Sequence, residues 1–295
     1  MNQTPAFWHS YENYARFELE HRSKTITQTL GLITKLCFLA DSENLSDLTT
    51  DVIRSFLHQG RSERNWSAKT FRLYRQYLKT FFMWAVGEGY LEINPVTPIK
   101  QPRLPKRLPR CLSPDEARKV LLASSNCNWY SELQCSRNEA ICYTLVYAGL
   151  RLSEFINLRS NDVCLKEKTI RVVEGKNDKE RLIPISDDLR LVLGRYQRDR
   201  KRLGVKSQWF FGSSKSEKQL TKKNATDIFR RVSKKSGVKF TAHMLRHTFG
   251  RICVESDIDI RTIQIWMGHE DIRTTQIYTY VSLSASQKAM KKLRC

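Results

Sequence analysis

The chain has 295 residues, which is enough to bury two modest hydrophobic cores, so two domains are expected. Its 51 lysines and arginines outnumber 30 acidic residues, and a net charge of +21 attracts a polyanion, with nucleic acid the first candidate. No apolar run is long enough to span a bilayer and the N-terminus does not resemble a signal peptide, so we expect a cytoplasmic protein that binds no membrane.

The first part of the chain has apolar residues at helical spacing. The clearest stripe runs from Trp66 to Val86, where aromatic and aliphatic residues recur every three or four positions. Its members are Phe71, Tyr74, Leu78, Phe82 and Ala85. The pattern predicts an all-helical domain over residues 1–93.

A proline-rich segment follows. Asn94 to Arg110 contains five prolines and five basic residues, a composition that cannot continue a helix and favours an extended backbone. We predict an interdomain linker over residues 94–111. Its charge suits a strap lying along phosphates, and a solvated linker is the alternative.

A second domain is predicted over residues 112–295. Ser113 and Pro114, followed by two acidic residues, form a strong helix start. Two β-branched runs, 169–174 and 181–185, flank the turn GKNDKE and predict a β-hairpin. Helices are expected near 114–124, 137–148, 152–158, 187–203, 221–235, 242–254, 258–267 and 271–279. The expected fold class is therefore mainly α with a small antiparallel β-sheet (α+β).

Eight cysteines are scattered along the chain without a C-x-x-C pair or the even spacing of a disulfide framework. We interpret them as reduced thiols. A disulfide or metal clip between Cys127 and Cys135 is the alternative.

Two motifs combine arginine with another polar residue. Arg151 follows a glycine turn in AGLRLSEF, with Glu154 three residues later on the same predicted helical face. In TAHMLRHTFG, the spacing of His243 and Arg246 places an imidazole beside a guanidinium, a pair suited to a phosphate. The alternatives are a surface ion pair for the first motif and a zinc-binding step of His243 with His247 for the second.

Three further residues complete a candidate site. Lys176 lies at the tip of the predicted hairpin, where a flexible ammonium can reach a substrate. IWMGHEDIRTTQIYTY offers His269 at a glycine-assisted turn and Tyr278 nine residues later. By themselves, Lys176 could be part of a solvated turn and Tyr278 a core aromatic residue. Cleaving a phosphodiester without metal needs a nucleophile, cations for the phosphoryl oxygens and an acid for the leaving oxygen, and these residues supply all three.

In this order the motifs resemble the tyrosine recombinase, or phage integrase, family, and within it the Xer-like branch. The resemblance spans residues 112 to 282 in five motifs, whereas the first part of the chain resembles the family's helical core-binding domain in size, helicity and position. It implies that this domain and a catalytic domain form a clamp on DNA.

The resemblance implies a role for each residue. Arg151 and Arg246 would clamp the scissile phosphate, and Glu154 would orient its neighbours. Lys176 would protonate the leaving 5′ oxygen. Two histidines would assist, His243 in proton transfer with the nucleophile and His269 by a hydrogen bond to the phosphate. Tyr278 would attack the phosphorus and form a 3′-phosphotyrosine link, without metal, nucleotide or any cofactor.

One departure from the family concerns the position two residues after the nucleophile. Xer-like relatives often carry histidine there, whereas this chain has Tyr280. A two-residue offset on a helix points to the opposite face, so we expect Tyr280 not to reach the same phosphate.

The implied partner is double-stranded DNA at a specific recombination site, at the nucleoid. The protein would act as a homotetramer on two sites or a heterotetramer with a related recombinase, linked by an exchanged C-terminal segment, residues 284–294. Two alternatives are a DNA-binding protein that has lost catalysis and an enzyme like type IB topoisomerases.

Overall fold

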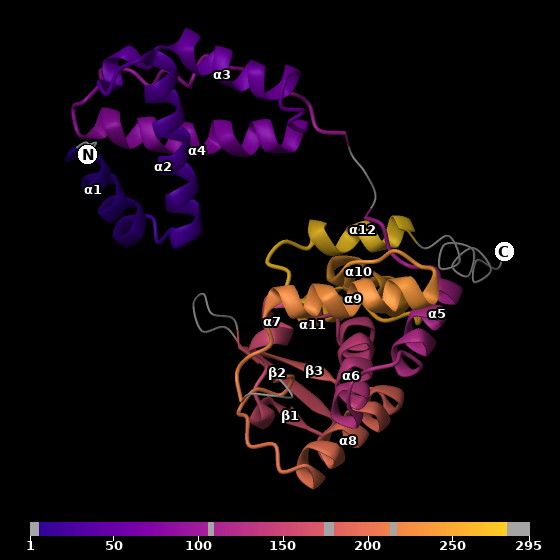
Figure 1. Cartoon of the computed structure of the whole chain (residues 1–295). Helices are drawn as coiled ribbons and strands as arrows, with labels where there is room; N and C mark the ends of the chain where they lie inside the picture. Colours follow the sequence, from indigo (N-terminus) through magenta and orange to yellow (C-terminus); the bar gives the residue numbers. More distant parts are fainter. Residues whose placement is uncertain (1–5, 106–108, 174–179, 213–216, 282–295) are drawn as a thin grey trace, which may run out of the picture. The chain divides into compact units, whose positions relative to one another are not determined.

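A computed structural model describes residues 6–105, 109–173, 180–212 and 217–281, with side chains of the last segment up to Tyr278. The chain divides into two compact units, unit 1 comprising residues 1–106 and unit 2 residues 107–295. Each unit has a hydrophobic core of its own. Figure 1 shows helices throughout unit 1, and helices with a small sheet in unit 2.

The described part of unit 1 is helical. Its α-helices are α1 (Ala6–Asn13), α2 (Ser23–Ala40), α3 (Thr50–Ser62) and α4 (Ala68–Gly87), with a π-helical turn over Tyr14–Glu18 and a 3-10 turn over Leu45–Asp47. Helix α4 begins where Ser67 accepts a hydrogen bond from the Thr70 amide, an N-cap that satisfies one of the free donors at the helix end. Phe71, Leu78 and Phe82 of the predicted stripe are buried in the core.

The start of the predicted linker is part of unit 1. Val96 and Ile99 are buried, and the buried guanidinium of Arg75 donates hydrogen bonds to the backbone carbonyls of both residues. Thr50 donates to the carbonyl of Pro95 at 2.8 Å. Residues 94–99 are therefore folded against α3 and α4, and the boundary between the units lies further on, at 106/107. Proline content alone could not show this, because the segment also supplies apolar side chains for the core.

Unit 2 follows the predicted order of elements. Its helices are α5 (Pro114–Ser125), α6 (Glu132–Ala148), α7 (Leu152–Asn157), α8 (Asp187–Arg202), α9 (Lys222–Ser236), α10 (Ala242–Glu255), α11 (Ile260–Met267) and α12 (Arg273–Val281), with a 3-10 turn over Ser160–Asp162. The predicted fold class, mainly helical with a small antiparallel sheet, is confirmed.

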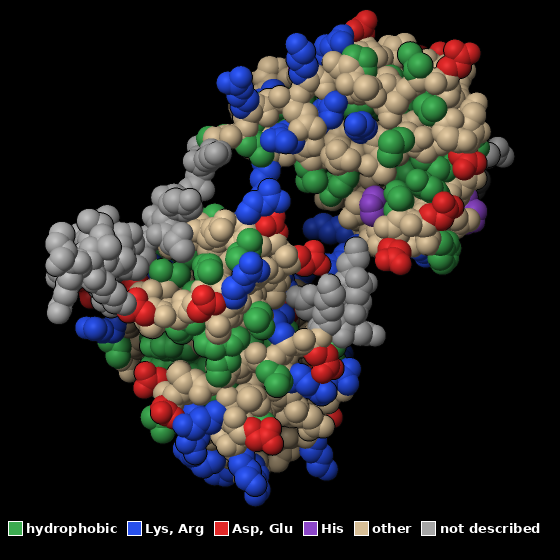
Figure 2. All heavy atoms as spheres, turned by 180° about the vertical axis from the view of Figure 1, so that it is seen from behind, with side chains coloured by type: hydrophobic (Ala, Val, Ile, Leu, Met, Phe, Trp, Pro, Cys, Tyr) green, Lys and Arg blue, Asp and Glu red, His purple; other side chains and the backbone are tan. Residues whose placement is uncertain are grey.

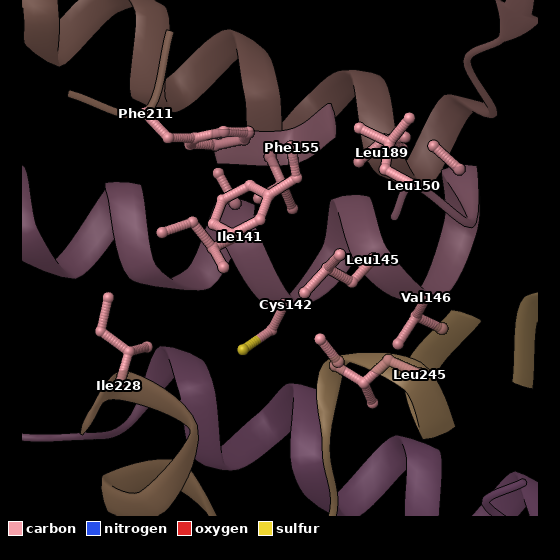
Figure 3. Close-up of a cluster of buried hydrophobic side chains, with 14 of the residues drawn as sticks. Ile141, Cys142, Leu145, Val146, Leu150, Phe155, Leu189, Phe211, Ile228 and Leu245 are labelled. Atoms are coloured by element: carbon pink, nitrogen blue, oxygen red, sulfur yellow. The ribbon is translucent and has the colours of Figure 1, made fainter. Parts of the chain in front are cut away.

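Helix α6 lies in the centre of unit 2, packed by α5, α8 and α10. Figure 3 shows Cys142, Leu145 and Val146 of this helix among side chains from other elements, including Phe155 of α7 and Leu245 of α10. Because α6 is buried on nearly all sides, its C-terminal end is held in place, and the chain turns from this end towards Arg151. The helix begins five residues earlier than predicted, since Ser131 caps it by accepting from the Gln134 amide.

The sheet has three antiparallel strands in the order β1 (Val163–Cys164), β2 (Thr169–Val173) and β3 (Glu180–Pro184). Strands β2 and β3 form the predicted hairpin, with Val172 opposite Arg181. Strand β1 was not predicted, because two residues are too short for an alternating pattern. The turn that carries Lys176 lies outside the described residues.

The chain's positive charge is spread over its surface. Figure 2 shows lysine and arginine side chains on both units, with acidic side chains among them. All seven cysteines in the described ranges are free thiols, so no disulfide joins Cys127 and Cys135. Among the helices of these same ranges, none is long and apolar enough to cross a membrane.

Candidate active site

A glycine turn places the first arginine of the site. Gly149 follows α6 in the left-handed conformation, with φ of +61°, and a Cβ atom built there would lie 2.3 Å from the ring of Phe249. Only glycine accepts both the dihedral angle and the close ring without strain. The chain then extends through Arg151, which is the N-cap of α7.

Arg151 and Glu154 meet as predicted, although Arg151 precedes the helix and does not lie on its face. The Glu154 carboxylate accepts from the Arg151 backbone amide at 2.7 Å and from its guanidinium at 2.7 Å. The same guanidinium donates to the carbonyl of Gly268, which follows α11. The Arg151 side chain is 36% exposed, so it remains accessible to an anion while its position is held.

Arg181 on β3 is a third partner of this cluster, and it was not predicted from the sequence. Its buried guanidinium contacts both carboxylate oxygens of Glu154, at 3.1 and 2.7 Å, and donates through Nε to the carbonyl of Trp266 at 2.9 Å. Burial by itself raises the pKa of Glu154, but the hydrogen bonds and charge of Arg181 bring the pKa below its ordinary value. Glu154 is thus an anion that ties the hairpin to α7 and α11.

Arg246 of α10 completes the cluster from the interior. It is 3% exposed and donates to the carbonyl of Gly149 at 2.7 Å and to that of Met267, while its guanidinium lies 3.9 Å from Glu154. Burial lowers the pKa of Arg246 to about 10, so it stays cationic at neutral pH. Three guanidiniums therefore surround one carboxylate, which leaves an excess of positive charge that suits a bound phosphate.

The second histidine motif is held at the end of α11. Gly268 caps this helix in the left-handed conformation, and His269 follows directly. Nδ1 of His269 lies 2.9 Å from the hydroxyl of Thr275, and its ring stacks on that of Tyr278 with centroids 6.4 Å apart. Burial, followed by the charges of Arg246 and Arg151, lowers the pKa of His269 to about 3, so its ring is neutral at physiological pH.

Tyr278 of α12 packs against α10. Its side chain is 1% exposed, and a Cβ at Gly250 would lie 2.7 Å from its ring, so the glycine allows this close approach. The Tyr278 hydroxyl lies 2.8 Å from Nδ1 of His247, a hydrogen bond whose direction depends on the imidazole tautomer. Burial raises the pKa of Tyr278 to about 12, although the charge of Arg246 opposes this, and the phenol is therefore protonated at rest.

His247 is the second residue of the site that was not predicted from the sequence. Its spacing to His243, one turn earlier on α10, indicates only a zinc-binding pair as an alternative. The two rings meet edge to face with centroids 5.1 Å apart, His243 exposed and His247 partly buried. Nδ1 of His247 faces the Tyr278 hydroxyl. Within the described ranges, no three His, Cys, Asp or Glu residues gather as metal ligands do.

Five of the predicted residues thus come together from four separate segments. Arg151, Glu154 and Arg246 belong to the arginine cluster. Tyr278 lies close enough to Arg246 for the positive charge to favour ionisation of its phenol, and the ring of His269 stacks on the ring of Tyr278. His243 joins through the ring of His247. Lys176 and the side chain of Tyr280 lie outside the residues that the structure describes.

Comparison with known proteins shows the family of the chain. Residues 110–284 match the sequence model of the phage integrase family, more than half of the chain. The chain belongs to this family. Tyrosine recombinase XerA of Pyrococcus horikoshii is 32% identical over 286 residues, 96% of this chain and 93% of the relative. Tyrosine recombinase XerD of Listeria monocytogenes is 32% identical over 222 residues, 73% of each protein.

Solved structures of recombinases share the fold. The crystal structure of XerA recombinase is 26% identical and matches with a TM-score of 0.56 over 98% of both chains. A complex of the XerH site-specific recombinase with palindromic difH substrate, at 22% identity, matches with a TM-score of 0.72 over 90% of this chain and 79% of XerH. The predicted family and its Xer-like branch are confirmed, and the chain is a tyrosine-type site-specific DNA recombinase.

Proposed function

We propose that unit 2 cleaves and rejoins one strand of duplex DNA at a time, with Tyr278 as nucleophile and the arginine cluster as the phosphate site. One observation supports this assignment: four segments bring their side chains together at a cluster with excess positive charge. These side chains are Arg151, Arg246, His269 and Tyr278. A phosphodiester is the anion whose cleavage uses this set: two guanidiniums for its oxygens and a phenol for its phosphorus.

Each residue has one task in the proposed reaction. Arg151 and Arg246 bind the non-bridging oxygens and stabilise the charge that grows on them in the transition state. His269 donates a hydrogen bond to the same phosphate. Lys176 protonates the leaving 5′ oxygen, and His243 assists proton transfer at the nucleophile.

Glu154 acts indirectly, as a positioning residue. It holds Arg151 through two hydrogen bonds and Arg181 through two more, and thereby connects the guanidiniums to the strand that follows the Lys176 turn. Its negative charge also offsets the repulsion among the buried cations.

The bonds exchanged are of similar energy. The phenolic oxygen forms a bond to phosphorus as the bond from phosphorus to the 5′ oxygen breaks, which leaves a 3′-phosphotyrosine link and a free 5′ hydroxyl. A 5′ hydroxyl of a second strand can then attack the same phosphorus and release the tyrosine. The phosphodiester energy is kept in the covalent link, so the exchange needs no ATP.

A groove beside the site offers a path for the DNA backbone. It runs between α9 and the start of α10 and reaches His243, and its rim carries the exposed side chains of Arg230, Lys234 and Lys239. Basic side chains along a groove hold phosphates in register without reading sequence. This supports duplex DNA as the partner.

Strand exchange between two duplexes needs four protomers. We propose a tetramer on two recombination sites, either of this chain alone or with a related recombinase, joined through residues 284–294, and we place its action at the nucleoid in the cytoplasm. Deleting 284–294 should weaken assembly on DNA more than binding of one protomer in gel-shift titrations, and an equal loss of both would contradict the exchange.

Trapping the covalent intermediate tests the proposed chemistry. Duplexes bound by the protein are first selected from a randomised library, and the recovered site is rebuilt with a nick beside the scissile phosphate so that cleavage cannot reverse. In EDTA, the wild-type protein should form a denaturation-resistant adduct, and Tyr278→Phe should bind the same duplex and form none. An adduct with Tyr278→Phe, or one that requires a divalent metal, would refute the mechanism.

A further inference from the structure

The nearest hydrogen-bonding partner of the proposed nucleophile is a residue to which no role has been assigned. His247 lies one residue after Arg246 on α10, and its Nδ1 is 2.8 Å from the hydroxyl of Tyr278. The two rings are tilted by 53° with centroids 5.6 Å apart, so the imidazole edge and not its face meets the phenol oxygen. In the tautomer that carries its proton on Nε2, Nδ1 accepts this hydrogen bond and is in direct contact with the atom that must lose a proton.

His243 is more exposed than His247. It lies at the first turn of α10, and its ring meets the ring of His247 edge to face with centroids 5.1 Å apart, whereas Nδ1 of His247 lies 2.8 Å from the Tyr278 hydroxyl. The order from the interior outward is therefore Tyr278, His247, His243. A proton that leaves the buried phenol passes first to His247.

We propose that His247 is the catalytic base of the reaction: its Nδ1 takes the proton of Tyr278 as the phenolic oxygen bonds to phosphorus. The inference rests on the proposed function, since it presupposes Tyr278 as the nucleophile. In the cleavage step the O–H bond of Tyr278 breaks, the bond from its oxygen to phosphorus forms and the bond from phosphorus to the 5′ oxygen breaks. His247 becomes an imidazolium, and the 5′ oxygen receives its proton from Lys176. In the rejoining step the imidazolium returns the proton to the phenol.

The environment of His247 keeps its imidazole neutral before substrate binds. Burial, followed by the charges of His243 and Arg246, lowers its pKa to about 4, so the imidazole is unprotonated at physiological pH. The raised pKa of Tyr278 keeps the proton on the phenol until a phosphodiester arrives. A bound phosphate adds negative charge near the imidazole, and bond formation makes the phenolic oxygen acidic, so transfer becomes favourable only with substrate in place.

Gly250 holds the pair together. It lies one turn after Arg246 on α10, and the ring of Tyr278 occupies the space that a side chain would fill. Any larger residue would move the phenol away from His247. Gly250 and His247 of α10 thus both contact Tyr278, and the ring of His269 stacks on that of Tyr278 with centroids 6.4 Å apart.

Substitution of His247 by asparagine separates hydrogen bonding from proton transfer. The amide of His247→Asn can occupy the place of Nδ1 and keep a hydrogen bond with Tyr278, but it cannot act as a base. His247→Ala removes both functions. Lys176→Ala is the matched control, because it impairs the leaving group and leaves the nucleophile untouched.

The experiment uses two nicked duplexes built on the recovered recombination site. One has the natural 5′ oxygen at the scissile phosphate and the other has a 5′-bridging sulfur, which leaves without protonation. The rate of adduct formation is measured for each protein at saturating DNA. His247→Asn should be slower than wild type by about 100-fold or more on both duplexes, in the range that general base catalysis contributes. Lys176→Ala should form the adduct slowly on the duplex with the 5′ oxygen and at a rate close to wild type on the duplex with the 5′-bridging sulfur.

Two results would overturn the role of His247. One is an adduct rate for His247→Asn within about threefold of wild type on the oxygen duplex, well below the contribution expected of a base. The other is recovery of this variant on sulfur, which would assign the histidine to the leaving group. In both cases the wild-type protein forms its adduct. Failure of the proposed function differs, because then wild type forms no adduct or Tyr278→Phe forms one.

Discussion

Glu154 offers the sharpest test of how the site is held together, because the chain contains a matched carboxylate. Asp162 is also buried, and it too accepts a hydrogen bond from the backbone amide three residues before it, that of Arg159 at 2.9 Å. The two carboxylates differ in their cations. Among the described residues, Glu154 faces three guanidiniums, whereas Asp162 pairs with Arg171, whose side chain is 47% exposed.

We expect Glu154→Gln to destabilise unit 2 by about 3 kcal/mol, the low end for breaking a buried ion pair, because the amide keeps one acceptor oxygen and Arg151 is partly solvated. Asp162→Asn should lower the free energy of unfolding of unit 2 by about 1 kcal/mol, since Arg171 stays hydrated after the charge of its partner is removed. For a unit of this size, the loss in Glu154→Gln corresponds to a melting temperature lower by about 6 to 12 °C.

The two units can unfold separately, so the assay must report each of them. Hydrogen exchange followed by mass spectrometry along a urea titration does so, with peptides from α6 reporting unit 2 and peptides from α4 serving as internal control. The pKa of Glu154 is lower in the folded protein than in the unfolded chain. Its contribution is therefore complete above the unfolded pKa of about 4.3 and is lost as pH falls through the folded pKa.

Equal shifts of the unit 2 urea midpoint by Glu154→Gln and Asp162→Asn at pH 7 would contradict this role of Glu154. A difference between the two variants that persists under acid conditions that protonate the folded carboxyl would contradict it as well. Either result would mean that the guanidiniums are held by backbone carbonyls without the help of the carboxylate.

Three further predictions concern the surroundings of the site. Gly149→Ala should lower the free energy of unfolding by about 2 to 4 kcal/mol, because of backbone strain and the collision with Phe249. Gly237 has a similar φ and open space around it, so Gly237→Ala should lower this free energy by about 1 kcal/mol. Urea titrations compare the two variants. Alkaline titration of phenol absorbance in wild type minus Tyr278→Phe should show one group with a pKa near 12. Because His247 and His269 have folded pKa values of about 4 and about 3, their stabilisation is complete above the unfolded pKa of about 6.5 and declines below it; replacing both with asparagine should flatten the fall in urea midpoint between pH 6.5 and 5.

Local signals in the sequence were sufficient for most of unit 2. The N-cap at Ser113 with Glu116, the left-handed turn at Gly149 and the β-branched hairpin each depend on neighbours within a few residues, and each is present in the structure. Interactions of this range are determined by residue type and spacing, which a sequence displays directly.

Arg181 and His247 were missed because their partners are distant in the chain. Arg181 meets Glu154 across 27 residues and His247 meets Tyr278 across 31. A basic residue at a hairpin and a second histidine on a helix are common, and only packing shows which one is buried against a carboxylate or a phenol. The segment 94–99 was missed for a related reason, since its docking depends on Arg75 of α4 and not on its own composition.

The arginine cluster also caps the ends of the two helices beside it that terminate at a glycine. The last carbonyls of a helix have no partner within the helix and carry its negative dipole end. Here the carbonyl of Gly149, after α6, accepts from Arg246, and the carbonyls of Met267 and Gly268, at the end of α11, accept from Arg246 and Arg151. The cations of the phosphate site are therefore also the caps of α6 and α11. The backbone carbonyls already orient these guanidiniums, so the side chains need little reorganisation when a phosphate binds to them.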